Sequence, residues 1–144
     1  MSKTAIVLFN LGGPDSQAAV RPFLFNLFND PAIIRLPGLL RYVLARLISS
    51  RRAPKAKDIY ALMGGRSPIL PETQAQAAAL KRSLGSDDYK VLISMRYWHP
   101  FSTEAARAAK DWGADRVLLL PLYPQFSTTT TASVADLCAR EAGP

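Results

Sequence analysis

The sequence predicts an α/β fold in which a parallel sheet is flanked by helices. Three runs rich in Val, Ile and Leu, at Thr4–Phe9, Tyr89–Met95 and Arg116–Leu120, have the length and composition of buried strands. The stretches between them carry apolar residues at helical spacing, and strands that alternate with helices pair in parallel through right-handed crossovers. Three strands make a thin sheet for this architecture, so we expect more of the protein beyond the carboxyl end.

Composition is that of one soluble globular domain. The 144 residues are 49% hydrophobic and 20% charged, and the chain shows no internal repeat, low-complexity tract or linker. A single cysteine, Cys138, excludes a disulfide within the chain and fits a cytoplasmic setting. The apolar run at the amino terminus is too short for a signal peptide or a membrane span, and a buried strand explains it better.

A tight turn and a helix follow the first strand. The segment Asn10–Ser16 contains two glycines and a proline, and Asp15 or Ser16 is placed to cap the next helix. Apolar residues then recur at helical spacing as far as Asp30; they are Val20, Phe23, Leu24, Leu27 and Phe28.

The middle of the chain predicts an apolar connector and two helices. The connector, Pro31–Pro37, is bounded by prolines. A helix is expected over Gly38–Ser50 and another over Pro54–Leu62, closed by the glycine pair at 64–65. One side of the first of these helices is apolar, formed by Leu40, Val43, Leu44, Leu47 and Ile48. Three further helices are predicted over Glu72–Leu84, Thr103–Trp112 and Thr131–Ala142.

Positive charge is concentrated in the first half of the chain. Residues 1–66 carry ten Lys and Arg against three acids, whereas residues 67–144 carry eight of each sign, so the first half holds the whole net charge of +7. This asymmetry suggests an anionic partner, which could be a nucleic acid, an acidic lipid, or a carboxylate or phosphate ligand. A solvated basic face without a ligand is the alternative.

Aromatic and polar residues follow all three predicted strands. Ligands of open α/β sheets collect at the carboxyl ends of the strands. Here those ends lead into Asn10–Asp15, Arg96–Pro100 and Pro121–Ser127. Aromatic walls suit a planar ligand, and arginines suit its carboxylates; the candidate pocket residues are Arg96, Tyr97, Trp98, His99, Tyr123 and Phe126. Alternatively, these aromatics simply fill the edge of the sheet.

Other chemistry is disfavoured by the motifs. The turn at Gly12–Pro14 lacks the spacing of a dinucleotide fingerprint, and its proline removes a donor that a phosphate would need. There is no Walker motif and no Ser-His-Asp order. His99 is the only histidine, without evident partner ligands, so we expect it to be structural and Cys138 to be a core residue.

Five segments, in order and at similar spacing, resemble the ferrochelatase family, and together they cover essentially the whole chain. They are Asn10-Leu11-Gly12-Gly13-Pro14, Arg51-Arg52-Ala53-Pro54-Lys55, Tyr60 with Gly64-Gly65-Arg66-Ser67-Pro68-Ile69, Arg96-Tyr97-Trp98-His99-Pro100, and Tyr123-Pro124-Gln125-Phe126-Ser127.

The resemblance implies a two-domain enzyme that inserts ferrous iron into protoporphyrin IX to give protohaem, a lyase of haem biosynthesis. Its fold would be Rossmann-like and of the chelatase type, with residues 1–144 as the amino-terminal porphyrin-binding domain. Family members place a catalytic histidine and a glutamate in the second domain, which would lie beyond Pro144. No catalytic residue is therefore assigned in this chain, and we expect the isolated piece to be inactive.

The same resemblance assigns site residues. It implies that Arg52, Tyr60 and Ser67 hold the porphyrin propionates, with Lys55 nearby, and that Leu11 lies against the porphyrin face. Two further assignments come with it. Tyr123 belongs to the substrate-binding set, and Arg96 and Tyr97 would lie on the metal-delivery side; no residue is assigned as a metal ligand.

Cofactor and partner expectations follow from the resemblance. Ferrous iron is a substrate and no cofactor is expected; animal members carry a cluster-ligating cysteine where Thr128 stands, and Cys138 alone does not replace it. Residues 31–50 resemble the family's lip, which implies a peripheral position on the inner face of the membrane. Alternatives are a coproporphyrin ferrochelatase, which Leu11 disfavours, and a non-catalytic porphyrin- or haem-binding module. A nucleic-acid partner is not expected, because no recognised module is present.

Overall fold

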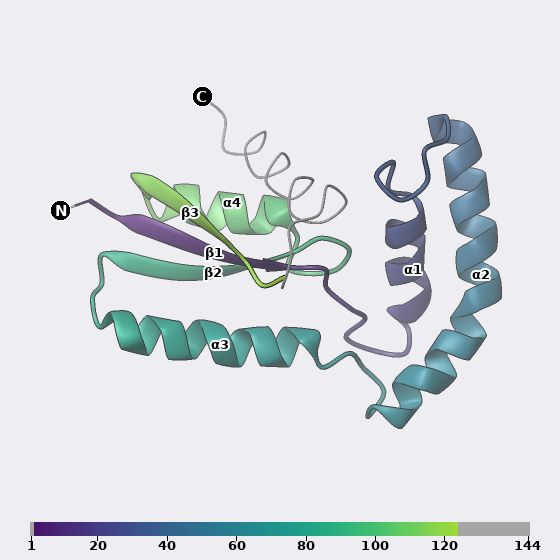
Figure 1. Ribbon diagram of the computed structural model, residues 1–144, viewed down its shortest axis with the longest axis horizontal. Helices are drawn as coiled ribbons and strands as arrows, with labels where there is room; N and C mark the ends of the chain where they lie inside the picture. The colour runs from purple at the N-terminus through teal and green to yellow at the C-terminus, as the bar shows by residue number, and fades with distance from the viewer. Residues whose placement is uncertain (1, 124–144) are drawn as a thin grey trace. The chain divides into compact units, whose positions relative to one another are not determined.

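A computed structural model describes residues 2–123 of the chain (Figure 1). These residues form two compact units. The sheet unit joins the amino-terminal strand, up to Leu11, to the chain from Pro71 onward, and the helix unit is Gly12–Leu70.

The sheet unit is built around its first strand. Strands β1 (Thr4–Asn10), β2 (Tyr89–Met95) and β3 (Arg116–Pro121) pair in parallel in the order β2-β1-β3, with Leu8 opposite Ile93 on one side and Leu120 on the other. The five residues from Ala5 to Phe9 are all buried. Such a run fits a strand that is paired at both edges and covered on both faces. The predicted α/β class and the parallel pairing are therefore confirmed.

Two helices flank this sheet. Figure 1 shows α3 (Ile69–Leu84) along one side of the strands and α4 (Ser102–Asp111) along the other. Helix α4 is joined to β2 by a buried hydrogen bond of 2.9 Å between the hydroxyls of Ser94 and Ser102. Both helices and all three strands lie within about two residues of their predicted bounds, apart from an earlier start of α3.

The helix unit is a pair of packed helices, α1 (Val20–Phe28) and α2 (Gly38–Leu62). Helix α2 buries small residues at a spacing of four, Ala45, Ser49 and Ala53. Four residues make slightly more than one helical turn, so these positions share a face and allow close packing. The large apolar residues of α2 lie mostly elsewhere, because Leu39, Leu40, Val43 and Leu47 are exposed.

Two local predictions are wrong. Residues 38–62 form one helix rather than two, with Pro54 inside it; the proline removes one amide donor and bends the helix without ending it, and Figure 1 shows the ribbon of α2 changing direction in its second half. Neither Asp15 nor Ser16 caps α1, whose cap position is Ala19. The Ser16 hydroxyl instead accepts the Ala19 N–H at 3.2 Å, in the turn before the helix. The glycine pair at 64–65 ends α2 as predicted, both residues having positive φ.

The predicted helix Thr131–Ala142 lies outside the described residues. Within residues 2–123, no helix combines the length and apolar character needed to cross a membrane.

Candidate functional site

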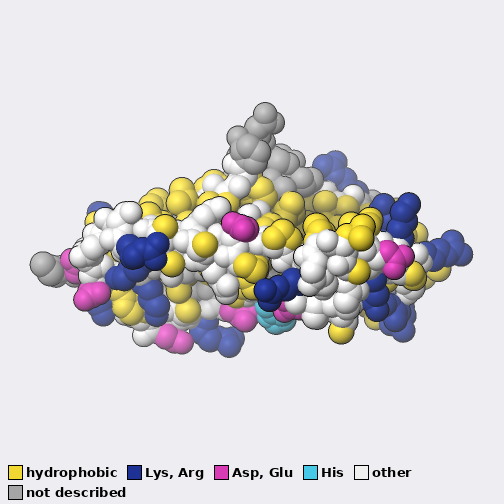
Figure 2. Space-filling view, turned by 90° about the horizontal axis from the view of Figure 1, so that it is seen from below, with side chains coloured by type: hydrophobic (Ala, Val, Ile, Leu, Met, Phe, Trp, Pro, Cys, Tyr) yellow, Lys and Arg dark blue, Asp and Glu magenta, His cyan; other side chains and the backbone are white. Residues whose placement is uncertain are grey.

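The helix unit contains a pocket with apolar walls and cationic groups. Its volume is about 460 Å³, within the range of small-molecule sites. Helix α1 supplies Phe23, Leu24, Leu27 and Phe28, and α2 supplies Arg51, Arg52, Lys55, Ala56, Ile59 and Tyr60. Three residues assigned to the substrate by sequence, Arg52, Lys55 and Tyr60, therefore line one pocket. Figure 2 shows Lys and Arg side chains exposed on the surface beside hydrophobic ones.

Helical spacing explains why these side chains meet. Arg52, Lys55 and Ile59 are three and four residues apart, so they share one face of α2. The Arg52 guanidinium lies 5.7 Å from the centre of the Phe28 ring, a cation–π contact that ties it to α1. Burial raises the pKa of the Tyr60 hydroxyl. A phenol is a hydrogen-bond donor at neutral pH.

The turn after β1 positions Ser67 through a close backbone approach. The Ser67 N–H donates to the Pro14 carbonyl at 2.8 Å. A Cβ on Gly13 would lie 2.5 Å from the Ser67 Cβ, closer than any real contact. Gly12, next to it, has φ 85°, which favours glycine. Gly12 and Gly13, which lack the spacing of a dinucleotide fingerprint, therefore allow Ser67 to pack against the turn.

A second group of predicted residues meets at the carboxyl edge of the sheet. The N–H groups of Arg96 and Tyr97 donate to the carbonyls of Asn10 and Leu11 at 3.0 and 2.9 Å, which extends the β1–β2 pairing beyond the strands. On the other side, the Leu122 N–H donates to the Phe9 carbonyl at 3.0 Å. Leu11, Arg96, Tyr97 and Tyr123 are thus brought to one edge, as the strand-end argument predicted.

The tyrosines at this edge are largely enclosed. Tyr97 is 2% exposed. The ring of Tyr123 packs edge-on against Phe9, with the ring centres 6.0 Å apart. Burial raises the pKa of Tyr123 to about 12, and the nearby Arg96 charge opposes that shift. Its buried hydroxyl has no hydrogen-bond partner in the part of the chain that the structure describes, so it is an unused donor beside the strand ends.

His99 is part of a helix cap. Its Nδ1 lies 2.9 Å from Glu104 Oε2, and the same carboxylate accepts the Phe101 N–H at the start of α4. The Phe101 N–H bond is the main reason that the pKa of Glu104 is lowered, with His99 contributing less. This geometry fits the structural role expected for His99. Across residues 2–123, no three His, Cys, Asp or Glu side chains cluster as metal ligands.

Sequence reasoning found the α2 side of the pocket and missed the α1 side. Phe23, Leu24, Leu27 and Phe28 were recognised as a helical apolar face, and nothing in their spacing showed that α2 would pack beside them. The remaining aromatics of the sheet edge contact one another, Trp98 with His99 and His99 with Phe101. Phe126, Thr128 and Cys138 lie outside the described residues.

Comparisons with known proteins place this geometry in a family. The family model described as Ferrochelatase matches residues 3–143. The chain is 60% identical over 135 residues to a ferrochelatase of Caulobacter vibrioides, covering 91% of this chain and 39% of that protein. It is 56% identical over 147 residues to a ferrochelatase of Phenylobacterium zucineum, covering 99% and 43%. With that of Wolbachia pipientis it shares 54% identity over 134 residues, covering 91% and 42%. The chain thus spans about two fifths of the length of these relatives.

Proposed function

The chain belongs to the ferrochelatase family, and we propose that it forms part of an enzyme that inserts ferrous iron into protoporphyrin IX. The match corresponds to roughly the first 40% of homologous ferrochelatases. One observation carries the assignment to this chain's own residues: Arg52, Lys55 and Tyr60 line a single apolar-walled pocket. A porphyrin is a planar apolar ring with anionic substituents, and this pocket offers both kinds of contact.

In this proposal the α2 cations hold the propionates. The Arg52 guanidinium can donate two parallel hydrogen bonds to one carboxylate, while Lys55 adds a point charge on the same helix face. The Tyr60 hydroxyl donates a further bond. Ser67, held against the Gly13 turn, adds a hydroxyl. The apolar α1 side chains cover the ring.

We assign the strand-end residues to the approach of the metal. Leu11 would contact the porphyrin face, Arg96 and Tyr97 would lie on the metal-delivery side, and the unpartnered Tyr123 hydroxyl would donate to substrate. Insertion of Fe²⁺ displaces both pyrrole N–H protons, so two protons leave for each iron that enters. The acceptor for those protons is proposed to lie beyond Pro144, and a 144-residue piece is expected to show no turnover.

Protoporphyrin is proposed over coproporphyrin. Coproporphyrin carries additional carboxylates and needs more cationic partners, and an apolar Leu11 beside the strand ends offers none. The two porphyrins should be supplied in competition to the full-length protein. Preferential metallation of coproporphyrin would overturn this choice while leaving the family unchanged.

A membrane surface is the proposed partner of residues 31–50. Leu39, Leu40, Val43 and Leu47 of α2 are 78, 59, 57 and 47% exposed, and we call these four side chains the α2 stripe. The helix does not meet the length and apolarity of a span, so it would lie in the plane of the interface. The exposure of these side chains supports a peripheral membrane contact, which we propose to be at the inner face.

Replacing Arg52 tests the porphyrin assignment. Arg52→Ala in the full-length protein should raise the KM for protoporphyrin roughly ten- to a hundredfold, the worth of a charge-assisted hydrogen bond. The value of kcat should change much less if the contact holds substrate and transition state equally. Arg82→Ala, an exposed cation of α3 that lies outside the pocket, is the matched control. An unchanged KM in the Arg52 variant would refute the propionate role.

A further inference from the structure

A second pocket in the helix unit shares no lining residue with the first. Its volume is about 290 Å³. Helix α1 contributes Arg21, Pro22 and Phe25, and α2 contributes Tyr42, Arg46 and Ser49. None of the residues assigned to the porphyrin, to the metal or to catalysis lies here.

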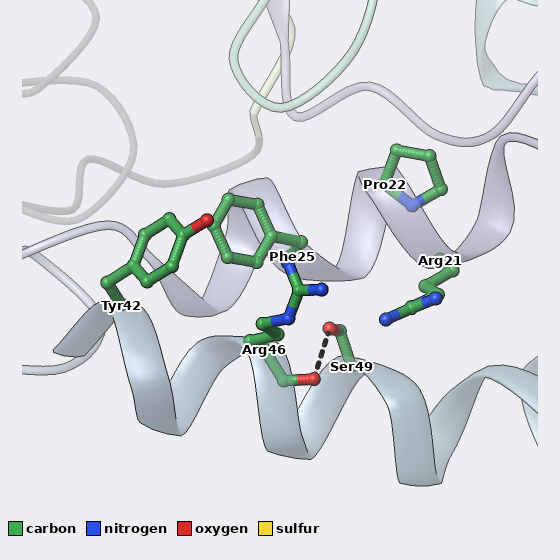
Figure 3. A pocket seen from close by; sticks show the side chains of 6 residues that line it. All are labelled: Arg21, Pro22, Phe25, Tyr42, Arg46 and Ser49. Atoms are coloured by element: carbon green, nitrogen blue, oxygen red, sulfur yellow. Dashed lines mark hydrogen bonds between the residues drawn. The ribbon is translucent and has the colours of Figure 1, made fainter. Parts of the chain in front are cut away.

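Two arginines from different helices converge on this pocket. Figure 3 shows the side chains of Arg21, on α1, and Arg46, on α2, reaching toward the same space. No acidic residue lines it. Neither guanidinium has a hydrogen-bond or ion-pair partner among residues 2–123. Two like charges repel one another, so an anion between them would be stabilised by both.

Two aromatic rings and a buried serine also line the pocket. Phe25 and Tyr42 pack edge to face with ring centres 5.3 Å apart, so they join the two helices beside the arginines. Ser49, which is 1% exposed, donates its hydroxyl to the Arg46 carbonyl at 3.1 Å (Figure 3). Tyr42 is 45% exposed, and its polar tip with an apolar ring suits the boundary between water and lipid.

The pocket lies beside the α2 stripe. Val43 precedes Arg46 by three residues, so the stripe and the pocket occupy neighbouring faces of the same helix. Residues 31–57 contain seven Lys and Arg and no acid. An exposed apolar stripe whose charged neighbours in residues 31–57 are all cations is complementary to a surface that is apolar inside and anionic at its boundary. An anionic bilayer has that arrangement.

We propose that Arg21 and Arg46 bind the phosphate group of an anionic phospholipid headgroup while the α2 stripe enters the acyl boundary. Guanidinium groups match phosphate oxygens with paired hydrogen bonds, and two of them can hold one phosphate from opposite sides. This inference rests on the membrane contact proposed above and adds a defined headgroup site to it. The site would fix how the helix pair is oriented on the membrane.

The test compares binding of the full-length protein to phosphatidylcholine vesicles with and without phosphatidylglycerol. Arg21→Gln combined with Arg46→Gln should weaken binding to the phosphatidylglycerol vesicles by about 30-fold, since each cation near an anionic surface is worth about 1 kcal/mol. Binding to pure phosphatidylcholine should not change. Arg82→Gln with Arg107→Gln removes the same charge from exposed positions of α3 and α4 and should cost much less. If the two double variants lose the same affinity for phosphatidylglycerol vesicles, the effect of the arginines is that of general surface charge and the proposal is overturned.

Two further arms separate the causes of failure. Leu39→Ser with Val43→Ser should weaken binding to both kinds of vesicle; if it does not, the membrane contact itself fails, whatever the arginines do. Glycerol 3-phosphate, added without lipid, should not raise the urea midpoint of the wild type. If it stabilises the wild type but not the Arg21/Arg46 variant, the site takes a soluble phosphate ester, and the lipid assignment is overturned. Urea unfolding and iron insertion into detergent-dispersed porphyrin, both expected unchanged, show that the arginine variant is folded and active.

Discussion

Strand β1 of the sheet unit and helix α2 of the helix unit use their apolar residues in opposite ways. In the sheet unit, the five residues from Ala5 to Phe9 are at most 5% exposed. In the helix unit, α2 buries Ala45, Ser49 and Ala53 and leaves the larger Leu39 and Leu40 more than half exposed. Burial of apolar area stabilises a fold, and exposure of it invites a partner. Strand β1 therefore contributes its apolar side chains to the core, whereas α2 leaves apolar surface that a partner could cover.

Positive charge is also concentrated in the helix unit. The helix unit, residues 12–70, contains nine Lys and Arg against three acids. The two pockets described above each contain at least two arginines and no acid. Exposed surface charges do little for stability, so the accumulation of cations in the unit with the exposed apolar stripe points to anionic ligands. The helix unit therefore carries +6 of the net charge of +7.

The largest expected effect compares the same change in both units. Phe9→Ala should lower the free energy of unfolding by about 3–5 kcal/mol, because the ring is 1% exposed and its removal leaves a cavity against Leu119 and Tyr123. Phe28→Ala should cost clearly less, since Phe28 is only partly buried beside the pocket. Urea unfolding of the two variants measures the difference. Equal losses of unfolding free energy in the two variants would contradict the contrast between the buried strand β1 and the partly open wall of the pocket.

A smaller effect tests the close approach within the helix unit. Gly13→Ala should cost about 1–3 kcal/mol, because the new Cβ would overlap Ser67 and the backbone must shift. Displacing Ser67 should also raise the KM for porphyrin. Gly38→Ala is the matched control: its Cβ would meet only the end of Arg41, at 4.0 Å, and a helical alanine should be neutral or slightly stabilising. If both variants keep wild-type KM, the turn does not serve the site.

The same contrast explains how much the sequence could predict. The strands were predictable from their continuous apolar runs, which in β1 follow from burial on both faces, and Tyr89–Met95 was predicted with its observed bounds. The meeting of Leu11, Arg96 and Tyr123 at one edge followed from parallel topology alone. These features depend on patterns local to each strand and on one general rule of sheet architecture.

The helix unit was less predictable because its features depend on packing between helices. The large apolar residues of α2 dominate its sequence pattern, yet the helix packs on the small residues Ala45, Ser49 and Ala53. Pro54 suggested a break, and the structure tolerates it within one helix. The pairing of Arg21 with Arg46 joins residues 25 positions apart, and no periodicity within either helix could show it.

The smallest effect concerns the cap of α4 and depends on pH. Glu104→Ala should cost about 1 kcal/mol at neutral pH, because the carboxylate accepts the Phe101 N–H and contacts His99. The pKa of Glu104 is lowered in the fold, first by that backbone hydrogen bond. Its contribution is therefore present above the pKa of an unfolded glutamate and is lost as the pH falls through the folded value. Urea unfolding of wild type and variant should show a gap that is largest at neutral pH and narrows in acid. The control is Glu72→Ala, in the first turn of α3, which should cost less stability because no described contact depends on Glu72. A stability difference between wild type and the Glu104 variant that stays constant with pH would mean that the carboxylate charge does not hold the cap.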